Sequence, residues 1–328
     1  MVTAAALGGG GLGVLGGALY GLMKLQVALA RKVIGAATMA PPSADGIYGA
    51  ELPGTPLRLL VLGDSAAAGY GLDSALDTPP ALLASGLSHI AGRPVLVRST
   101  AKVGARSSDL NRQLDAGLEH RPDVAVVVVG ANDVTHTVLP SESILQLQAA
   151  VRRLRECDVA FVVGTCPDLG TVQPVAQPLR LLARLWSRRL AAAQTIVAVE
   201  AGGRSVSLGA LLGPSFSLAP TELFGPDRFH PSEAGYASLA AALLPTVAAA
   251  VGVWDDDDGE VAEWEPERGS SLLPVSFAAA RAVIEDGTEV AATDVAGRDR
   301  GGPGRWALLR HRSQPPLSAA VEPEPTSA

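Results

Sequence analysis

Short apolar runs alternate along the middle of the chain with longer stretches of helical periodicity. The runs are almost continuous in Val and Leu, which is typical of strands that are covered on both faces. They are Leu57–Leu62, Val95–Arg98, Val124–Val129, Val159–Val163 and Thr195–Val199. The helical stretches are Thr78–Ala91, Arg106–Glu119, Ser141–Glu156, Leu179–Ala193 and Ser232–Val251. This order predicts an α/β domain in which helices sandwich about five parallel strands, with functional side chains at the carboxyl ends of the strands.

Composition narrows the classes of function. The chain has 328 residues, a net charge of −7 and no dense stripe of Lys or Arg, so nucleic acid is excluded as a main partner. No HExxH, CxxC or HxH spacing occurs, and we therefore expect neither a metal nor another cofactor. The two cysteines are Cys157 and Cys166, whose pairing the sequence leaves open.

The chain divides into four parts. Residues 1–40 form an apolar leader, and residues 41–56 are rich in Pro and Gly turn signals that mark a linker. Residues 57–252 form the globular domain. The acidic tail, residues 253–328, is predicted to be largely disordered, with one short helix at Phe277–Ile284.

The leader contains an uncharged stretch, Thr3–Met23, that is long enough to cross a bilayer as a helix. Its Gly13, Gly17 and Gly21 repeat every fourth residue, as in membrane helices that approach each other closely. We expect membrane association in the cell envelope through residues 3–23; the alternative is a leader that is merely rich in Ala and Gly. Three positive residues follow the stretch and favour a cytoplasmic domain, but so few charges leave the side of the membrane open.

Four short blocks follow the predicted strands or precede the last helix. Gly63-Asp64-Ser65 ends the first strand, and Gly104 follows the second. Asn132, within Gly-Ala-Asn-Asp, follows the third strand, where its amide can donate to a developing oxyanion. Asp227 lies three residues before His230, close enough to fix the tautomer of the ring. Taken singly, each block is also explained as an ordinary turn or helix cap.

Together, and in this order, the blocks resemble the SGNH hydrolases, also called the GDSL esterase/lipase family. The match lies at Ser65, Gly104, Asn132 and His230 and covers about residues 57–251. Ala66 stands where the family's name has leucine. The stretches GANDVTH and VVGTCPDLGTVQPVAQPLR further resemble actinobacterial members that carry a membrane leader.

The resemblance implies a flavodoxin-like three-layer fold and a serine esterase. Ser65 would be the nucleophile, His230 the base and Asp227 the residue that orients it. The oxyanion hole would consist of the backbone N–H groups of Ser65 and Gly104 and the side chain of Asn132. We expect a carboxylic ester with a short-to-medium acyl group, from a small molecule, a lipid or a glycan. The alternatives are an acyltransferase with the same triad and a membrane-tethered module without activity.

Other residues near these blocks have ordinary interpretations. His136 is more typical of a turn than of a pocket wall, and Asp133 is predicted to hold its block in shape. Cys166 is predicted to be a small buried thiol. The segment Pro167–Pro178 contains three prolines and predicts a loop that borders the cleft and shapes the acyl pocket.

A basic face is predicted on the helix that starts at Leu179, because Arg180, Arg184 and Arg188 recur every four residues. We favour a solvated outer helix of the sandwich. The alternative is contact with anionic lipid headgroups.

Overall fold

The computed structural model describes residues 3–35, 39–253 and 289–290, with side chains over 17–35 and 39–253. These residues build a 7-stranded sheet in the order β1-β3-β2-β4-β5-β6-β7. The strands are β1 (Gly46–Tyr48), β2 (Leu57–Gly63), β3 (Val95–Ser99), β4 (Val124–Val128), β5 (Ala160–Gly164), β6 (Arg204–Val206) and β7 (Glu289–Val290). The run β3-β2-β4-β5-β6 is parallel, and β1 and β7 pair antiparallel at its two edges. The parallel core has the strand order of flavodoxin-like folds, which confirms the predicted fold class.

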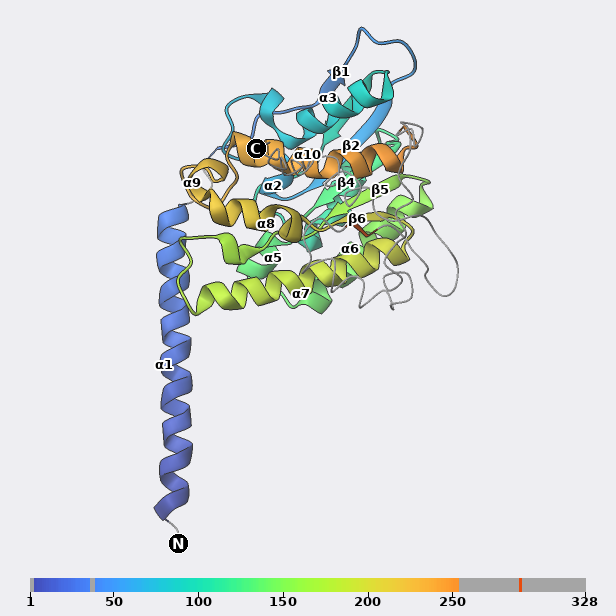
Figure 1. Cartoon of the computed structure of the whole chain (residues 1–328). Helices are drawn as coiled ribbons and strands as arrows, with labels where there is room; N and C mark the ends of the chain where they lie inside the picture. Colours follow the sequence, from blue (N-terminus) through green and yellow to red (C-terminus); the bar gives the residue numbers. More distant parts are fainter. Residues whose placement is uncertain (1–2, 36–38, 254–288, 291–328) are drawn as a thin grey trace, which may run out of the picture.

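Helices cover both faces of the sheet (Figure 1). One layer holds α3 (Pro79–Ala91), α8 (Leu208–Leu218) and α10 (Glu233–Ala250), and the other holds α4 (Leu110–Leu118), α6 (Pro140–Glu156) and α7 (Leu179–Glu200). The short elements are α2 (Ser65–Ala68), α5 (Ala131–Thr135), α9 (Pro220–Leu223), η1 (Ala75–Asp77), η2 (Ser107–Asp109) and η3 (Leu169–Thr171).

The two helix layers explain why the strands read as continuous apolar runs. In β2, Leu59 and Val61 pack into the core beneath α3 and α10, whereas Leu60 and Leu62 pack beneath α4 and α6. Every residue of β4 is buried. Both faces of these strands therefore need apolar side chains.

One predicted strand is wrong. Thr195–Val199 forms the last turns of α7, where Thr195, Val197, Ala198 and Val199 are buried against the sheet. Its β-branched residues imitate a strand, although the helical pattern continues through them. The fifth parallel strand is β6, whose three residues are too few to stand out in the sequence.

The edges of the sheet come from segments outside the predicted domain. The predicted linker contains β1, which is held by Asp45: its carboxylate forms a 2.6 Å ion pair with Arg98 and accepts the backbone N–H of Ser99 at 2.7 Å. The tail contributes β7. The predicted helix Phe277–Ile284 lies outside the described residues.

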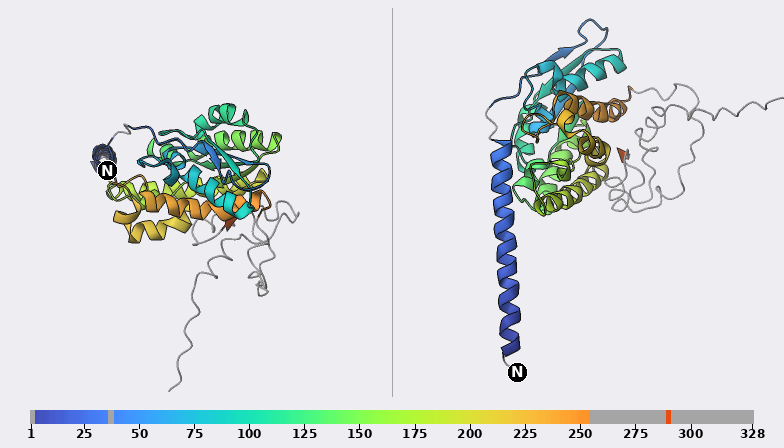
Figure 2. Two further views of the ribbon diagram at one scale, coloured as in Figure 1. Left: turned by 90° about the horizontal axis from the view of Figure 1, so that it is seen from above. Right: turned by 60° about the vertical axis from the view of Figure 1, so that its left-hand side comes forward.

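Helix α1 (Thr3–Ile34) projects from the domain and meets it only near its C-terminal end (Figures 1 and 2). Among the residues whose side chains are described, the helix long and apolar enough to cross a membrane is α10. Of its 18 residues, 56% are buried within the domain, as in the core helix of a globular fold.

Candidate active site

Ser65 is the first residue of α2, directly after β2, and the chain turns sharply there against the end of β4. Gly63 has φ +136°, and a Cβ at this position would lie 1.8 Å from the carbonyl oxygen of Val128. The N–H of Asp64 donates to that same carbonyl at 3.0 Å, and its carboxylate accepts the N–H of Ala66 at 2.9 Å. The glycine is therefore required by the close approach of the two strand ends.

Two buried glutamines fasten the strand ends. Gln113 of α4 accepts the N–H of Gly63 at 2.8 Å and donates to its carbonyl at 2.9 Å. Gln194 of α7 donates to the carbonyl of Val129 at 2.9 Å and accepts the N–H of Cys166 at 2.7 Å. Neither glutamine is among the residues predicted from the sequence. The available signal was a glutamine on the apolar face of a helix, where an unpaired amide would be costly.

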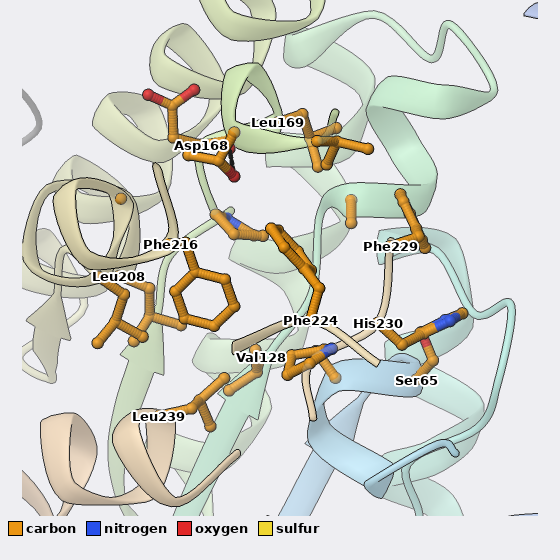
Figure 3. A pocket seen from close by; sticks show the side chains of 18 of the residues that line it. Ser65, Val128, Asp168, Leu169, Leu208, Phe216, Phe224, Phe229, His230 and Leu239 are labelled. Atoms are coloured by element: carbon orange, nitrogen blue, oxygen red, sulfur yellow. Dashed lines mark hydrogen bonds between the residues drawn. The ribbon is translucent and has the colours of Figure 1, made fainter. Parts of the chain in front are cut away.

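Folding brings Ser65 into contact with His230, which lies 165 residues away in the sequence. Nε2 of His230 is 3.0 Å from the Ser65 hydroxyl oxygen, and Nδ1 is 2.6 Å from Oδ2 of Asp227. The other carboxylate oxygen of Asp227 accepts the backbone N–H groups of Phe229 and His230, each at 2.9 Å. Figure 3 shows Ser65 and His230 side by side at the edge of a cavity.

The loop that carries His230 is closed on itself. The N–H of Gly225 donates to the carbonyl of His230 at 2.8 Å, and the N–H of Ser232 donates to the carbonyl of Leu223 at 2.9 Å. The Ser232 hydroxyl then caps α10. The ring of Tyr70 stands 4.5 Å from the imidazole, centroid to centroid, and limits its movement.

Tyr236 of α10 connects the Ser65 turn with Tyr70, the residue that packs against His230. Its buried hydroxyl donates to the carbonyl of Tyr70 at 2.8 Å and lies 3.4 Å from the carbonyl of Ser65. Burial raises the pKa of this hydroxyl well above its ordinary value, so it remains a donor at physiological pH.

Asp227 is the ionised partner of the pair. Burial tends to raise its pKa, but the hydrogen bonds from the His230 ring and from the two backbone N–H groups hold the pKa below its ordinary value. The carboxylate therefore carries a full negative charge beside Nδ1 at neutral pH.

The other two predicted blocks lie at the same end of the sheet. The loop after β3 contains Gly104, with φ +79°, and is tied to β2 by the N–H of Lys102, which donates to the carbonyl of Gly63 at 3.0 Å. Asn132 starts the turn of α5, and its Nδ2 donates to the carbonyl of Ala105 at 3.0 Å. Asn132 and the Gly104 loop are therefore held together.

Asp133 is the buried fastener of this loop. Its carboxylate accepts the N–H of Ser107 at 3.1 Å and the hydroxyls of Ser107 and Ser143 at 3.2 and 2.8 Å. These contacts are those of a residue that holds its loop in shape, as predicted from the sequence.

An apolar cavity of about 80 Å³ opens beside Ser65 and His230. Its wall combines the end of β4 with the segment after β5, with α8 and with the His230 loop (Figure 3). The apolar side chains that line it include Val128, Leu169, Val172, Leu208, Leu212, Phe216, Phe224, Phe229 and Leu239. Such a wall suits a hydrocarbon group attached to the reacting carbon.

His136 and the two cysteines, which are also considered in the sequence analysis, have no hydrogen bond with Ser65, His230 or Asp227 in the described structure. His136 is exposed at the end of α5, with Nδ1 2.9 Å from the carbonyl of Asn132. Cys157 is exposed and Cys166 is buried, and both are free thiols. Burial raises the pKa of Cys166 well above its ordinary value, so the thiol is neutral. Within the described residues, no group of three or more His, Cys, Asp or Glu is arranged to hold a metal ion.

A serine, a histidine and an aspartate in a hydrogen-bonded series, at the carboxyl end of a parallel sheet, have the geometry of serine hydrolases. Residues 61–238 match the GDSL-like lipase/acylhydrolase family. A protein of Mycobacterium tuberculosis named GDSL-like esterase Rv1075c is 42% identical over 256 residues, which are 74% of this chain and 80% of that protein. The chain therefore belongs to the GDSL-like lipase/acylhydrolase family, which confirms the family predicted from the sequence.

Solved structures of similar fold include TesA and an acetyl-xylooligosaccharide esterase of Geobacillus. TesA is 23% identical, with a TM-score of 0.47, over 59% of this chain and 99% of its own. The Geobacillus protein, Axe2 in a mutant form, is 20% identical, with a TM-score of 0.49, over 60% of this chain and 95% of its own.

Asp64 is an unusual carboxylic acid. It is fully buried, and its pKa is raised to about 7. Burial is the main cause and the charge of Asp133 adds to it, whereas the N–H groups of Ala66 and Gly130 and the charge of His230 oppose the rise. The folded protein therefore holds a proton here that an unfolded chain releases near pH 4.

We predict that, because the pKa of Asp64 is higher in the folded than in the unfolded protein, the folded protein becomes less stable as the pH rises from about 4 to about 7. In that interval the unfolded chain gains free energy by ionising Asp64 and the folded chain does not, so the free energy of unfolding falls by about 4 kcal/mol. Replacing Asp64→Asn should remove this slope. The measurement is denaturant unfolding of both proteins at a series of pH values; a pH-independent difference between them would contradict the assignment.

Proposed function

We propose that this chain hydrolyses carboxylic esters through an acyl-enzyme on Ser65. The single observation that carries the proposal is the hydrogen-bonded series from Ser65 through His230 to Asp227, placed at the mouth of an apolar cavity. The name of the Mycobacterium tuberculosis relative, an esterase, supports the same activity.

The chemistry follows from these contacts. The Ser65 oxygen attacks the ester carbonyl carbon while Nε2 of His230 takes its proton. The C–O bond of the ester then breaks, and the imidazolium returns the proton to the leaving alcohol. Water repeats the sequence on the acyl-enzyme and releases the carboxylic acid. Asp227, held ionised, stabilises the imidazolium in both halves.

The oxyanion is assigned to the backbone N–H groups of Ser65 and Gly104 and to the amide of Asn132. An amide nitrogen carries two hydrogens. One hydrogen of Asn132 is used by the carbonyl of Ala105, which orients the group and leaves the second for the substrate oxygen. The loop of Gly104 is fixed by Lys102 and Asp133, so the donors are set before the substrate binds.

The cavity is assigned to the acyl group. Its volume of about 80 Å³ is small and its lining is mostly apolar, so it would enclose a short acyl chain more completely than a long one. This supports short-to-medium acyl groups as the substrates.

We predict that Ser65→Ala abolishes ester hydrolysis, with turnover reduced by about 10⁴-fold or more because the nucleophile is lost. A fluorophosphonate probe should label the wild-type chain and not this variant. Ser238→Ala is the matched control: this half-buried serine donates a hydrogen bond to the carbonyl of Ala234 within α10, and its variant should keep both labelling and activity. Near-normal hydrolysis by Ser65→Ala would refute the proposed function.

The profile of acyl length is a second prediction. With p-nitrophenyl esters from acetate to palmitate, kcat/KM should be highest between butyrate and octanoate and about tenfold lower for palmitate, whose chain exceeds the cavity. Faster hydrolysis of palmitate than of acetate or butyrate would show that the cavity is not the acyl site.

We also propose that residues 3–23 anchor the enzyme in the cell-envelope membrane. The stretch is uncharged, and as part of helix α1 it would extend about 31 Å, the thickness of a bilayer's hydrocarbon core. The same helix meets the catalytic domain only beyond this stretch, which leaves it available to lipid.

Fractionation tests this anchor. The full chain should sediment with membranes, resist high salt and be released by detergent. The double substitution Leu12→Lys with Leu15→Lys should move it to the soluble fraction, because each buried charge costs about 3 kcal/mol in a bilayer. The matched pair Leu25→Lys with Leu29→Lys, outside the stretch, should not. A wild-type chain in the soluble fraction would exclude the anchor.

A further inference from the structure

One wall of the acyl cavity is a single segment, residues 167–179, which runs from the end of β5 to the start of α7. We call it the pocket strap. Pro167, Asp168, Leu169, Thr171 and Val172 line the cavity, and the side chains of Leu169 and Val172 are buried. The rest of the strap passes over the protein toward helix α1.

The first end of the pocket strap is fastened by Asp168, whose residue is only 5% exposed. Its Oδ2 accepts Nε of Arg184 at 3.1 Å and Nε and Nη2 of Arg188 at 3.3 and 3.1 Å. Its Oδ1 accepts the N–H of Gly170 at 2.8 Å. The paired arginines on α7 thus hold the strap rather than forming a purely solvated face. A buried carboxylate met by two guanidinium groups fixes position as well as charge.

The second end is fastened by helix α1. Gln26 donates from Nε2 to the carbonyl of Gln177 at 2.5 Å and accepts the N–H of Leu179 at 3.1 Å. Gln26 is 7% exposed, whereas its neighbours Leu25 and Leu29 on the same helix are 56% and 53% exposed. Gln26 and Ala30 are buried in this part of α1, and the hydrogen bonds of Gln26 are made with the pocket strap.

We propose that the pocket strap selects the acyl group and that Asp168 and Gln26 are positioning residues that set its place. The helix that precedes the domain would then contribute to substrate choice without touching the substrate. This inference rests on the proposed esterase function.

The pocket strap can change acyl selectivity without changing the attack by Ser65, because the strap and the catalytic residues are held by different contacts. Gln113 binds the backbone of Gly63, two residues before Ser65, and the hydroxyl of Tyr236 lies 3.4 Å from the carbonyl of Ser65. Asp227 binds His230, and none of these three partners belongs to the pocket strap. A shifted wall changes how well each methylene is enclosed, which controls the relative kcat/KM of long and short chains. It leaves the attack on a small acetyl ester unchanged.

The test compares Asp168→Asn, Arg188→Gln and Gln26→Ala in the full chain. For each variant, kcat and KM are measured on p-nitrophenyl acetate, butyrate, octanoate and palmitate. We expect the ratio of kcat/KM for octanoate over palmitate to fall about tenfold in all three variants. In Arg188→Gln and Gln26→Ala, whose side chains lie outside the cavity, kcat on acetate should stay within about twofold of the wild type. Arg188→Gln leaves Arg184 paired with Asp168, so it keeps the test valid if Asp168→Asn does not fold.

Matched controls are Leu25→Ala, exposed beside Gln26, and Arg189→Gln, exposed on α7 outside the Asp168 cluster; both should keep the wild-type profile. Thermal unfolding shows that each variant is folded at the assay temperature. The double variant Asp168→Asn with Arg188→Gln should lose no more selectivity than Asp168→Asn alone, because both act through one contact.

The outcomes separate the two proposals. A wild-type chain that hydrolyses none of the esters overturns the esterase function itself. Active variants that retain the wild-type profile overturn the role of the pocket strap. A changed profile in Asp168→Asn and Arg188→Gln, with none in Gln26→Ala, overturns the contribution of helix α1.

Discussion

The contact on which the site depends is the approach of the carboxyl end of β2 to that of β4. At Gly63 the backbone turns within reach of the Val128 carbonyl, which leaves no space for a side chain, and the next N–H bonds to that carbonyl. The side-chain amide of Gln113 forms hydrogen bonds with both the N–H and the carbonyl of Gly63. These hydrogen bonds fix the backbone that carries Ser65, and they do not involve His230 or Asp227.

The site also separates two kinds of environment within a few residues. Asp227 is kept ionised by three hydrogen bonds, whereas burial favours the neutral form of Asp64. One carboxyl group therefore serves as a charge for His230, and the other as part of the buried framework. The cavity beside Ser65 is lined mostly by apolar side chains. The polar triad and the apolar cavity match the two parts of an ester, a polar reacting carbon and an apolar acyl chain.

Much of this arrangement could be predicted from the sequence because the signals were local. Four of the five predicted strands were found where the apolar runs lie, and the residues of the four blocks came together at one end of the sheet. The strand predicted at Thr195–Val199 was wrong because β-branched residues at a buried helix end have the same composition as a strand. Strand β6 was not predicted because three residues are too few to show a periodic pattern. Gln113, Gln194 and the pairing of Asp168 with two arginines depend on contacts between distant segments, which no local pattern encodes.

The attachment of α1 also bears on how the catalytic domain is to be studied. A recombinant protein shortened to begin after Ile34, which is the usual way to avoid an apolar leader, would lack Gln26. The carbonyl of Gln177 and the N–H of Leu179 would then turn to solvent. Kinetics measured on such a truncated domain would describe an enzyme that lacks one of the attachments of its pocket strap.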